Sequence, residues 1–449
     1  MRWKLSYIER IIDVNITCFV RLEGSFDVNQ VRSALSRVQR KHPVLRALVR
    51  DGHDGPYYEA DCAPEIPLRI LARVSEHDYR QECQSELTTA FPPGQPQLRA
   101  VWLQSEWESD LLLTTTHRIC DGMSVFTIVR EVLCGLQNAG ELIPYEPVTV
   151  HDIIGNYRPL KPWKHKLAVL LMNGVLRLIP TSRRPPENNE HHLEWGAGPA
   201  LSAALKQRCK TEGVSVHALL VVALERALFL TFGRKLPKTI VSPIDLRRGR
   251  FTALKSDTVF FGGGDIKLRA CHSQEVDFWT RARVVHEEIR RELDREIRDV
   301  PARFHFLEQI RPLSSGQIRW IMRLGDALKS NRSRFGLANL GNVATSGRDV
   351  PLGVKDMRLY GHSFSFRTFG LVPYTVNGDM RFYFSIDGKC MGRSEAEKLQ
   401  REFIQVLHNQ GFSMTGQEAD TVSRESRPFP NTRSPSRMPL TNRSDLNPI

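Results

Sequence analysis

The sequence predicts an α+β protein with two lobes. Helical and strand periodicities mix within residues 25–117, and a polar, proline-rich stretch that starts at Thr181 interrupts the pattern. Near the other end of the chain, Asn377-Gly378 lies between two alternating segments, as in a β-hairpin. The length of 449 residues is too great for one ordinary core and favours two or three domains.

The first lobe is expected over residues 1–182 and is mixed α+β. Residues 25–42 repeat apolar side chains at helical spacing behind Asp27 as a helix cap, and this helix should end at His42-Pro43. Short strands are expected after it at residues 44–50, 68–74, 98–103 and 111–117.

Residues 183–195 are interpreted as a linker, because proline, asparagine and charge replace any hydrophobic period there. The second lobe is expected over residues 196–412, and residues 413–449, which contain few apolar side chains, are expected to be a disordered tail. The elements expected in the second lobe are a buried helix from Ser215 to Gly233, a strand at 239–244, a charged helix at 275–299, hairpin strands at 371–376 and 380–387, and a helix at 394–409.

The net charge of +13 favours acidic partners, among them anionic lipid, phosphorylated cofactors and acidic carrier proteins. Nucleic acid is not expected as a partner. Arginines in the charged helix alternate with acidic residues, and aromatic residues make up only 8% of the chain with no basic-aromatic interleaving. The excess of positive charge therefore indicates a smaller anionic ligand, an acidic protein or a lipid surface.

The eight cysteines show neither a metal-site nor a disulfide spacing, and charged residues interrupt the apolar positions of the N-terminus. We expect reduced thiols in a cytoplasmic protein without a bound metal. Residues 167–179 form the longest hydrophobic run, which is too short to span a bilayer and has basic flanks. Two interpretations stay open for this run: a helix packed on the core, and an interfacial helix on an anionic membrane.

One motif carries the chemistry. In LLLTTTHRICDGMSVF a strand runs into His117, and Asp121 and Gly122 follow in a turn before an apolar helix. Gly supplies backbone freedom and Asp anchors the turn. A rigidly held imidazole with a pKa near neutrality suits a general base, although the same pattern alone also fits a structural His–Asp hydrogen bond.

Two other features carry less weight. His191-His192 is interpreted as part of a solvated loop and not as a metal site. The glycines at residues 262–264 lack the lysine and helix start of a phosphate loop and are interpreted as a strand bend.

Seven segments stand in the order found in one superfamily. They are LSYIER around residues 6–9, KHPVLR at 41–46, FPPGQPQLRA at 91–100, TTHRICDG, TEGVSVHALLVVAL, SPIDLRRG, and FGLANLGNV at 335–343. Across residues 3–410 the chain resembles the chloramphenicol-acetyltransferase-like superfamily, which includes condensation domains of nonribosomal peptide synthetases. It is most similar to the stand-alone polyketide-associated acyltransferases. The DFGWG motif of plant HxxxD acyltransferases has no match.

The resemblance implies two similar lobes, each a two-layer sandwich, forming a V around a central tunnel. His117 matches the catalytic base of the family, and Asp121 matches an aspartate that pairs with an arginine. Arg46 is the first choice for that arginine and Arg247 the second, with Gly122 supporting the turn. Thr116, which stands where longer motifs have a first histidine, is expected to line the tunnel with Asn339 and Gly341.

These similarities imply an acyltransferase that acts on a lipid, a polyketide or another secondary metabolite. The donor would be a thioester, acyl-CoA or an acyl carrier protein, the acceptor a hydroxyl or amine, and no cofactor stays bound. We expect a monomer, with peripheral membrane contact as an option. The alternatives are an amide-forming condensation domain and a non-catalytic member of the fold.

Overall fold

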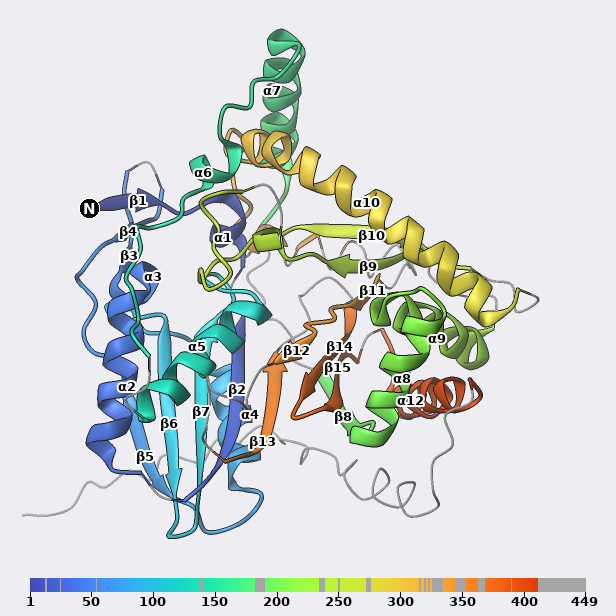
Figure 1. The fold of residues 1–449 in the computed structure, drawn as a ribbon. Coiled ribbons are helices and arrows are strands. Elements are labelled where there is room, and N and C mark those ends of the chain that lie inside the picture. Colours follow the sequence, from blue (N-terminus) through green and yellow to red (C-terminus); the bar gives the residue numbers. More distant parts are fainter. Residues whose placement is uncertain are drawn as a thin grey trace, which may run out of the picture.

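The computed structural model describes residues 1–410, apart from short gaps (Figure 1). The gaps lie at residues 13, 25, 54, 138–139, 182–189, 234–238, 249–250, 272–275, 315, 319, 322–323, 325–333, 344–352, 362–367 and 389. The predicted tail at 413–449 lies outside the described residues.

The first lobe contains a five-stranded sheet in the order β13-β2-β7-β6-β5. Its strands are β2 (Asn15–Glu23), β5 (Leu68–Ala72), β6 (Leu98–Gln104), β7 (Glu108–Thr116) and β13 (Val354–Gly361). Helices α2 (Val28–Lys41) and α5 (Gly122–Leu136) cover one face, and α4 (Asp78–Thr88) covers the other (Figure 1). Strand β7 is buried at eight of its nine positions, as a strand covered on both faces should be.

The prediction for α2 is confirmed, including its cap. The side chain of Asp27 accepts a hydrogen bond from the backbone N–H of Asn29, which satisfies one of the unpaired donors at the helix start. The strand predicted at residues 44–50 is wrong in its first half. Pro43–Arg46 is the short helix α3, which proline favours at its first position, and only Leu48–Arg50 forms strand β3.

A small sheet and a short helix complete the N-terminal region. Strand β3 pairs with β4 (Tyr57–Glu59), and β4 pairs in turn with β1 (Arg2–Lys4). Helix α1 (Tyr7–Ile11) follows β1 and begins with a capping box between Ser6 and Glu9.

The second sheet has the order β10-β9-β11-β14-β15-β8, with β12 beside β14. Its strands are β8 (Glu190–Gly196), β9 (Thr239–Pro243), β10 (Asp265–Arg269), β11 (Arg334–Leu337), β12 (Asn342–Val343), β14 (Thr368–Val376) and β15 (Asp379–Asp387). The predicted hairpin is confirmed, since β14 and β15 meet at Asn377-Gly378, whose φ angles are 49° and 83°. Positive φ at both positions is what such a two-residue turn requires.

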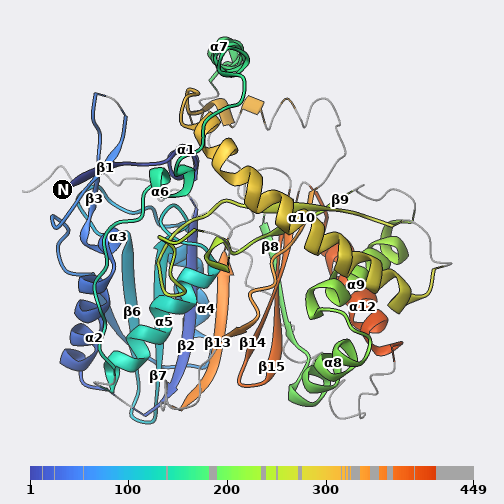
Figure 2. The same ribbon diagram turned by 45° about the horizontal axis from the view of Figure 1, so that its top comes forward.

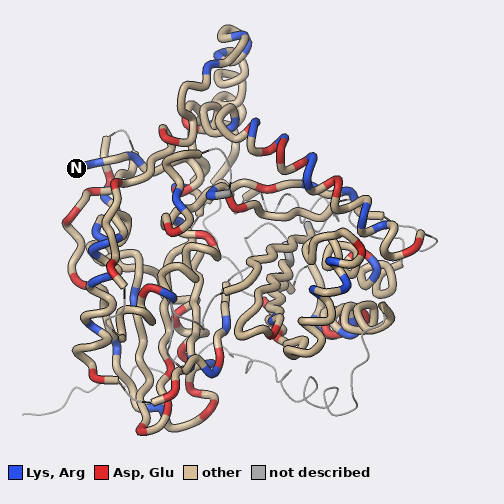
Figure 3. The backbone as a smooth tube through the Cα atoms, viewed as in Figure 1, with Lys and Arg blue, Asp and Glu red and all other residues tan. Residues whose placement is uncertain are grey.

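The helices of the second lobe are α8 (Pro199–Thr211), α9 (Val216–Phe232), α10 (Phe278–Leu307) and α12 (Arg393–His408). Helix α9 is buried at most of its positions, as predicted from its all-round apolar pattern. Helix α10 carries the predicted alternation of charges, visible as mixed colours in Figure 3, but it extends eight residues past the expected end and includes Pro301.

The predicted linker is too long at its C-terminal end. Glu190–Gly196 is strand β8, and it pairs antiparallel with β15 along its whole length. This strand has no continuous apolar run, but Leu193 and Trp195 pack in the core of the second lobe and β15 pairs with it. The interpretation of His191-His192 as a solvated loop is wrong for the same reason, because His192 is 8% exposed and contacts the hydroxyl of Tyr383 at 2.7 Å.

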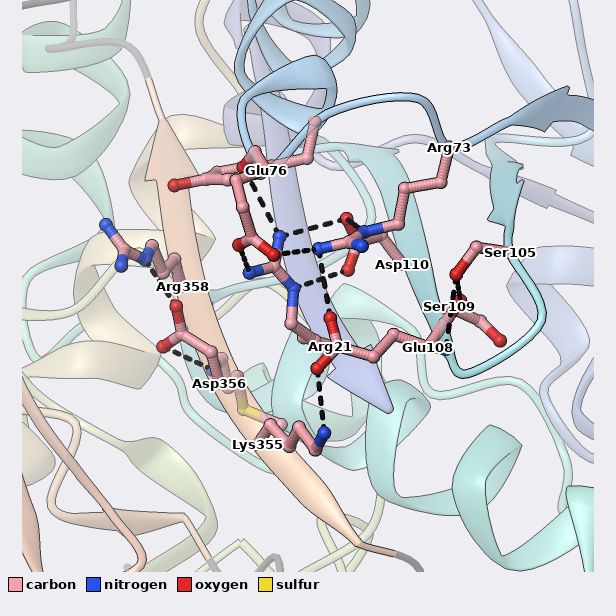
Figure 4. Close-up of polar contacts among 12 residues, drawn as sticks. Arg21, Arg73, Glu76, Ser105, Glu108, Ser109, Asp110, Lys355, Asp356 and Arg358 are labelled. Carbon is pink, nitrogen blue, oxygen red and sulfur yellow. Dashed lines mark hydrogen bonds and ion pairs between the residues drawn. The ribbon is translucent and has the colours of Figure 1, made fainter. Parts of the chain in front are cut away.

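Strand β13 joins the two lobes. It comes after the strands β8 to β12 of the second sheet in sequence, yet it pairs with β2 at the edge of the first sheet. Ion pairs reinforce this pairing at the far end of the sheet, where Lys355 of β13 binds Glu108 of β7 at 2.7 Å (Figure 4). The predicted boundary at residue 182 is therefore not a clean division between the two sheets.

Helix α7 (Pro162–Leu178) follows α6 (Val150–Ile154) and stands clear of both sheets in two views (Figures 1 and 2). Leu176 is its only buried residue. The interpretation of this segment as a helix packed on the core is therefore wrong. Among the described residues no single helix is long and apolar enough to cross a bilayer; only α8 and α9 taken together reach that composition, and they meet at 105°.

Candidate active site

His117 directly follows strand β7, whose last residue, Thr116, pairs with Asn15 of β2. The backbone N–H of His117 donates to the carbonyl of Val14 at 2.7 Å, so the histidine is fixed to the neighbouring strand as well as to its own. A side chain held at the end of a central strand has little freedom to move, which suits a group that must meet a reacting atom.

A hydrogen bond from Nδ1 helps to hold the ring of His117. Nδ1 lies 2.7 Å from the carbonyl oxygen of Cys120, an acceptor, so Nδ1 carries the proton in the neutral ring. Nε2 is then the basic nitrogen. Burial lowers the pKa of His117 below its ordinary value of 6.5, because the charged form loses hydration. The neutral base is therefore the predominant form at neutral pH.

A segment of the second lobe reaches the histidine. The ring of Phe261 meets that of His117 edge to face, with centroids 4.9 Å apart. Two residues on, Gly263 has a φ of 56°, and a Cβ at this position would come within 2.7 Å of Ile8 in α1. The glycines at 262–264 thus do not bend within a strand; they form an irregular segment before β10 that packs between α1 and the histidine.

Asp121 pairs with Arg247. The two terminal nitrogens of the guanidinium group, Nη1 and Nη2, bind the two carboxylate oxygens at 2.8 and 3.0 Å, a bidentate ion pair across 126 positions of sequence. The prediction of Arg46 as the first-choice partner is wrong. Arg46 pairs with Asp61 on the loop after β4, because α3 directs it away from the turn. The second choice, Arg247, is the correct one.

Asp121 also caps helix α5. Its Oδ1 accepts the backbone N–H of Ser124 at 2.8 Å, so the same carboxylate starts the helix and binds the second lobe. Sequence reasoning missed Ser124. Its hydroxyl contacts Nη2 of Arg247 at 2.6 Å and the backbone of Phe260 at 3.0 Å, and its position three residues after the cap is the signal that identifies it.

Arg247 is almost completely buried, with 4% of its side chain exposed. It also binds Asp245 at 2.9 Å and the carbonyls of Thr258 and Phe260 at 2.8 and 3.1 Å. Its carboxylate partners raise the pKa of Arg247 against the opposing effect of burial. The arginine therefore holds the HxxxDG turn and the segment that leads to Phe261 in one fixed arrangement.

Gly122 has a different role from the predicted one. Its φ is not positive, so it supplies no unusual backbone freedom; instead a Cβ there would lie 2.9 Å from Leu340 of the second lobe. Leu340 lies between Asn339 and Gly341, and the Asn339 side chain accepts the N–H of Gly341 at 3.0 Å. The asparagine-glycine segment thus contacts the HxxxDG turn directly, through the leucine between the two predicted residues.

Thr116 lies beside the histidine as expected and is 3% exposed. Its hydroxyl accepts the backbone N–H of Arg118 at 3.4 Å. That Thr116, Asn339 and Gly341 line a substrate tunnel remains a prediction. In the described part of the chain, no group of three His, Cys, Asp or Glu side chains is arranged to hold a metal ion, and none of the eight cysteines forms a disulfide.

The KHPVLR segment contributes a buried polar cluster that the sequence did not reveal. Lys41 binds Glu131 of α5 and Asp257 at 2.5 Å each, and His42, fully buried, contacts Glu131 at 2.7 Å and the hydroxyl of Tyr145 at 2.9 Å. Asp257 lies next to Thr258, whose carbonyl binds Arg247. The cluster therefore fastens the same second-lobe segment to helices α2 and α5.

No protein-family model matches the chain. Among curated proteins, a probable nonribosomal peptide synthetase of Salinispora arenicola, CymA, is 27% identical over 231 residues, a match that covers 46% of this chain and 3% of the synthetase. The chain thus corresponds to a small part of the curated relatives that it matches.

Solved structures agree along nearly the whole chain. Polyketide synthase associated protein 5 of Mycobacterium tuberculosis has a TM-score of 0.60 at 15% identity, covering 91% of this chain and 98% of its own. The trichothecene 15-O-acetyltransferase TRI3 of Fusarium sporotrichioides has a TM-score of 0.64 at 10% identity, with 92% and 96% covered. The condensation domain of the monacolin K polyketide synthase MokA has a TM-score of 0.61 at 12% identity, with 96% and 99% covered.

At these identities the structural matches establish the fold. The resemblance predicted from the sequence is thereby confirmed, and the chain has the two-lobed fold of the condensation-domain and chloramphenicol-acetyltransferase-like superfamily.

Proposed function

We propose that this protein is an acyltransferase with His117 as its general base, moving an acyl group from a thioester to a hydroxyl or amine. One observation carries the proposal: the hydrogen bond from Nδ1 of His117 to the carbonyl of Cys120, which leaves Nε2 as the basic nitrogen. The similarity in fold to an O-acetyltransferase and to condensation domains supports acyl transfer as the reaction class.

In this mechanism Nε2 of His117 takes the proton of the acceptor hydroxyl or amine as its oxygen or nitrogen attacks the thioester carbonyl. The tetrahedral intermediate then collapses, the carbon–sulfur bond breaks, and the imidazolium returns the proton to the departing thiolate. Protons and charges balance without a cofactor. Asp121 and Arg247 keep the turn in place and do not contact the reacting atoms in this scheme.

The donor is either acyl-CoA or an acyl group on a carrier protein. The sequence match to a nonribosomal peptide synthetase favours the carrier protein. The same match makes amide formation the second candidate function, with an amine in place of the hydroxyl acceptor.

The test is acyl transfer by the purified protein from a panel of acyl-CoA and acyl carrier protein donors to alcohols and amines. The His117→Ala variant should lose activity about 10²- to 10⁴-fold, the usual contribution of a general base. His77→Ala is the matched control, because this exposed histidine precedes α4 without a side-chain capping bond. An unchanged rate in His117→Ala would refute the mechanism, and product formation with amines alone would favour the condensation reaction.

A further inference from the structure

Helix α7 presents an apolar surface to solvent. Eight of the 17 large hydrophobic residues that are exposed in the described chain lie between Leu160 and Leu178. They are Leu160, Trp163, Leu167, Leu170, Leu171, Met172, Val175 and Leu178, with exposed fractions from 39% to 100%. Seven of the eight lie on α7 itself, and such a concentration is unusual for a protein surface and marks a site of contact.

The helix is attached along one narrow seam. His165, Val169, Asn173 and Leu176 are its less exposed positions and recur every three or four residues, as one face of a helix does. Asn173 bonds to the backbone of Gln309 and Arg311 just beyond α10, and Leu176 packs with Tyr7 and Ile310. The rest of the circumference is left uncovered by the described residues.

The opposite face carries the apolar stripe. Trp163, Leu167, Leu171 and Leu178 are spaced by four, four and seven residues, which places them on one side of an α-helix, away from the seam. Lys164 lies beside Trp163, with its ammonium group 5.3 Å from the ring centroid. A tryptophan next to a lysine at the start of an apolar stripe is the composition that lipid interfaces select.

The charge around the stripe has one sign. Residues 158–181 contain no Asp or Glu, and their basic residues are Arg158, Lys161, Lys164, Lys166 and Arg177. All five are exposed, and Figure 3 shows blue without red along α7. Lys166 and Arg177 lie three turns apart on the same side of the helix, so the stripe has a basic flank along its length.

We propose that α7 is a membrane-docking helix that lies on an anionic lipid surface, with its leucines in the interface and its lysines among the headgroups. A bilayer fits both observations at once, because it offers an apolar layer directly beneath a negatively charged one. A second copy of the chain would bring the same five positive charges together. Residues 411–449 carry five arginines against four acidic residues and have no negative excess to offer this helix.

Docking would also orient the candidate active site. Leu176 packs with α1, whose Ile8 lies against Gly263, and Gly263 is two residues from Phe261, which contacts His117. A short series of contacts thus connects the proposed lipid-facing helix to the histidine. That lipid-dissolved substrates enter from this side rests on the proposed acyl transfer, whereas the docking itself does not.

The experiment is flotation of the purified full-length protein with phosphatidylcholine vesicles, with and without phosphatidylglycerol. We expect flotation only with the anionic lipid and its loss at high salt, because the Debye length falls from about 10 Å at 0.1 M to about 3 Å at 1 M. Flotation that is equal with both vesicles, or absent from both, would overturn the proposal.

Double variants separate the contribution of the apolar residues of α7 to vesicle binding from that of its lysines. Leu167→Asp with Leu171→Asp should abolish flotation, whereas Leu230→Asp with Val284→Asp, at exposed apolar positions of α9 and α10, should leave it intact. Lys164→Glu with Lys166→Glu should lower binding more than roughly 25-fold, since each basic residue near an anionic surface contributes roughly a fivefold factor in partitioning.

The charge control is Arg290→Glu with Arg291→Glu, which makes the same change on exposed positions of α10. Equal loss in this control would mean that net charge, and not α7, decides binding. Sedimentation without lipid tests whether a second copy of the chain covers α7. Self-association that Leu167→Asp abolishes would assign α7 to a dimer interface and overturn membrane docking. Since the readout is binding, failure of acyl transfer would leave it unaffected.

Discussion

The two ends of strand β7 each hold a carboxylate bound by arginine, but the partners come from different places. At the first end, Asp110 is fully buried and binds Arg21 of β2 and Arg73 after β5 at 2.8 and 3.0 Å, all within the first lobe (Figure 4). Beyond the other end, Asp121 binds Arg247 of the second lobe. The ion pairs of Asp110 connect residues of the first lobe only, whereas the ion pair between Asp121 and Arg247 connects the two lobes beside His117.

This difference teaches how the site is built. Asp110, Arg21 and Arg73 can form their contacts as soon as the first sheet forms. Asp121 reaches Arg247 only when the segment around η1 (Leu246–Arg248) has docked on α5. The geometry of His117 therefore depends on the assembly of both lobes, whereas the contacts of Asp110 lie within the first sheet.

The largest expected effects are those of removing the carboxylates of Asp110 and Asp121, and they should differ in turnover. Asp110→Ala and Asp121→Ala should each lower the free energy of unfolding by about 3–5 kcal/mol, because each removes a carboxylate that binds buried arginine charge. Only Asp121→Ala should also lower the turnover of the folded fraction. Chemical denaturation and the rate per folded molecule measure the two effects. A normal rate in Asp121→Ala would mean that the lobes hold His117 without this ion pair.

A smaller effect is expected at Gly122, the contact between the lobes beside the histidine. Gly122→Ala should destabilise the protein by about 1–3 kcal/mol, because its Cβ would lie 2.9 Å from Leu340. Leu340→Ala removes the obstructing side chain, so the double variant should show less loss than the sum of the single ones. Gly174→Ala is the control, with open space around its Cβ. Additive losses in the thermal melts would show that the two residues are not coupled.

The smallest effect is the pH dependence of the rate, which concerns His117 and not Asp110. Burial lowers the pKa of His117 below 6.5, so the neutral base persists at and below that pH in the folded protein. The rate should stay constant through neutral pH and decline about tenfold per pH unit below the lowered pKa. The same group removes stability as pH falls through this range, because the unfolded chain binds the proton first. A rate profile with its midpoint above 6.5 would contradict the assignment.

Much of the candidate site could be predicted from local sequence. A strand of leucines and threonines before His117, a capping Asp121 and an apolar helix after it can be predicted from neighbouring residues, because the side-chain pattern is local and the cap and helix form hydrogen bonds over a few positions of the chain. The same holds for α2 with its Asp27 cap and for the turn at Asn377-Gly378. These elements lie where the sequence predicts them.

Only the tertiary structure decided the partners and the exposed faces. Arg46 lies in the short helix α3 and Arg247 in the short helix η1, and only the packing of the second lobe selected the one that reaches Asp121. Strand β8 exists because β15 offers its hydrogen bonds, and Gly122 is needed because Leu340 arrives from a distant segment. The apolar run of α7 would have the same sequence pattern in a buried helix and in an exposed one, so the sequence did not show that it is exposed. A pattern fixes which face of a helix is apolar, whereas long-range contacts determine what covers that face, since they join residues whose separation leaves no local signal.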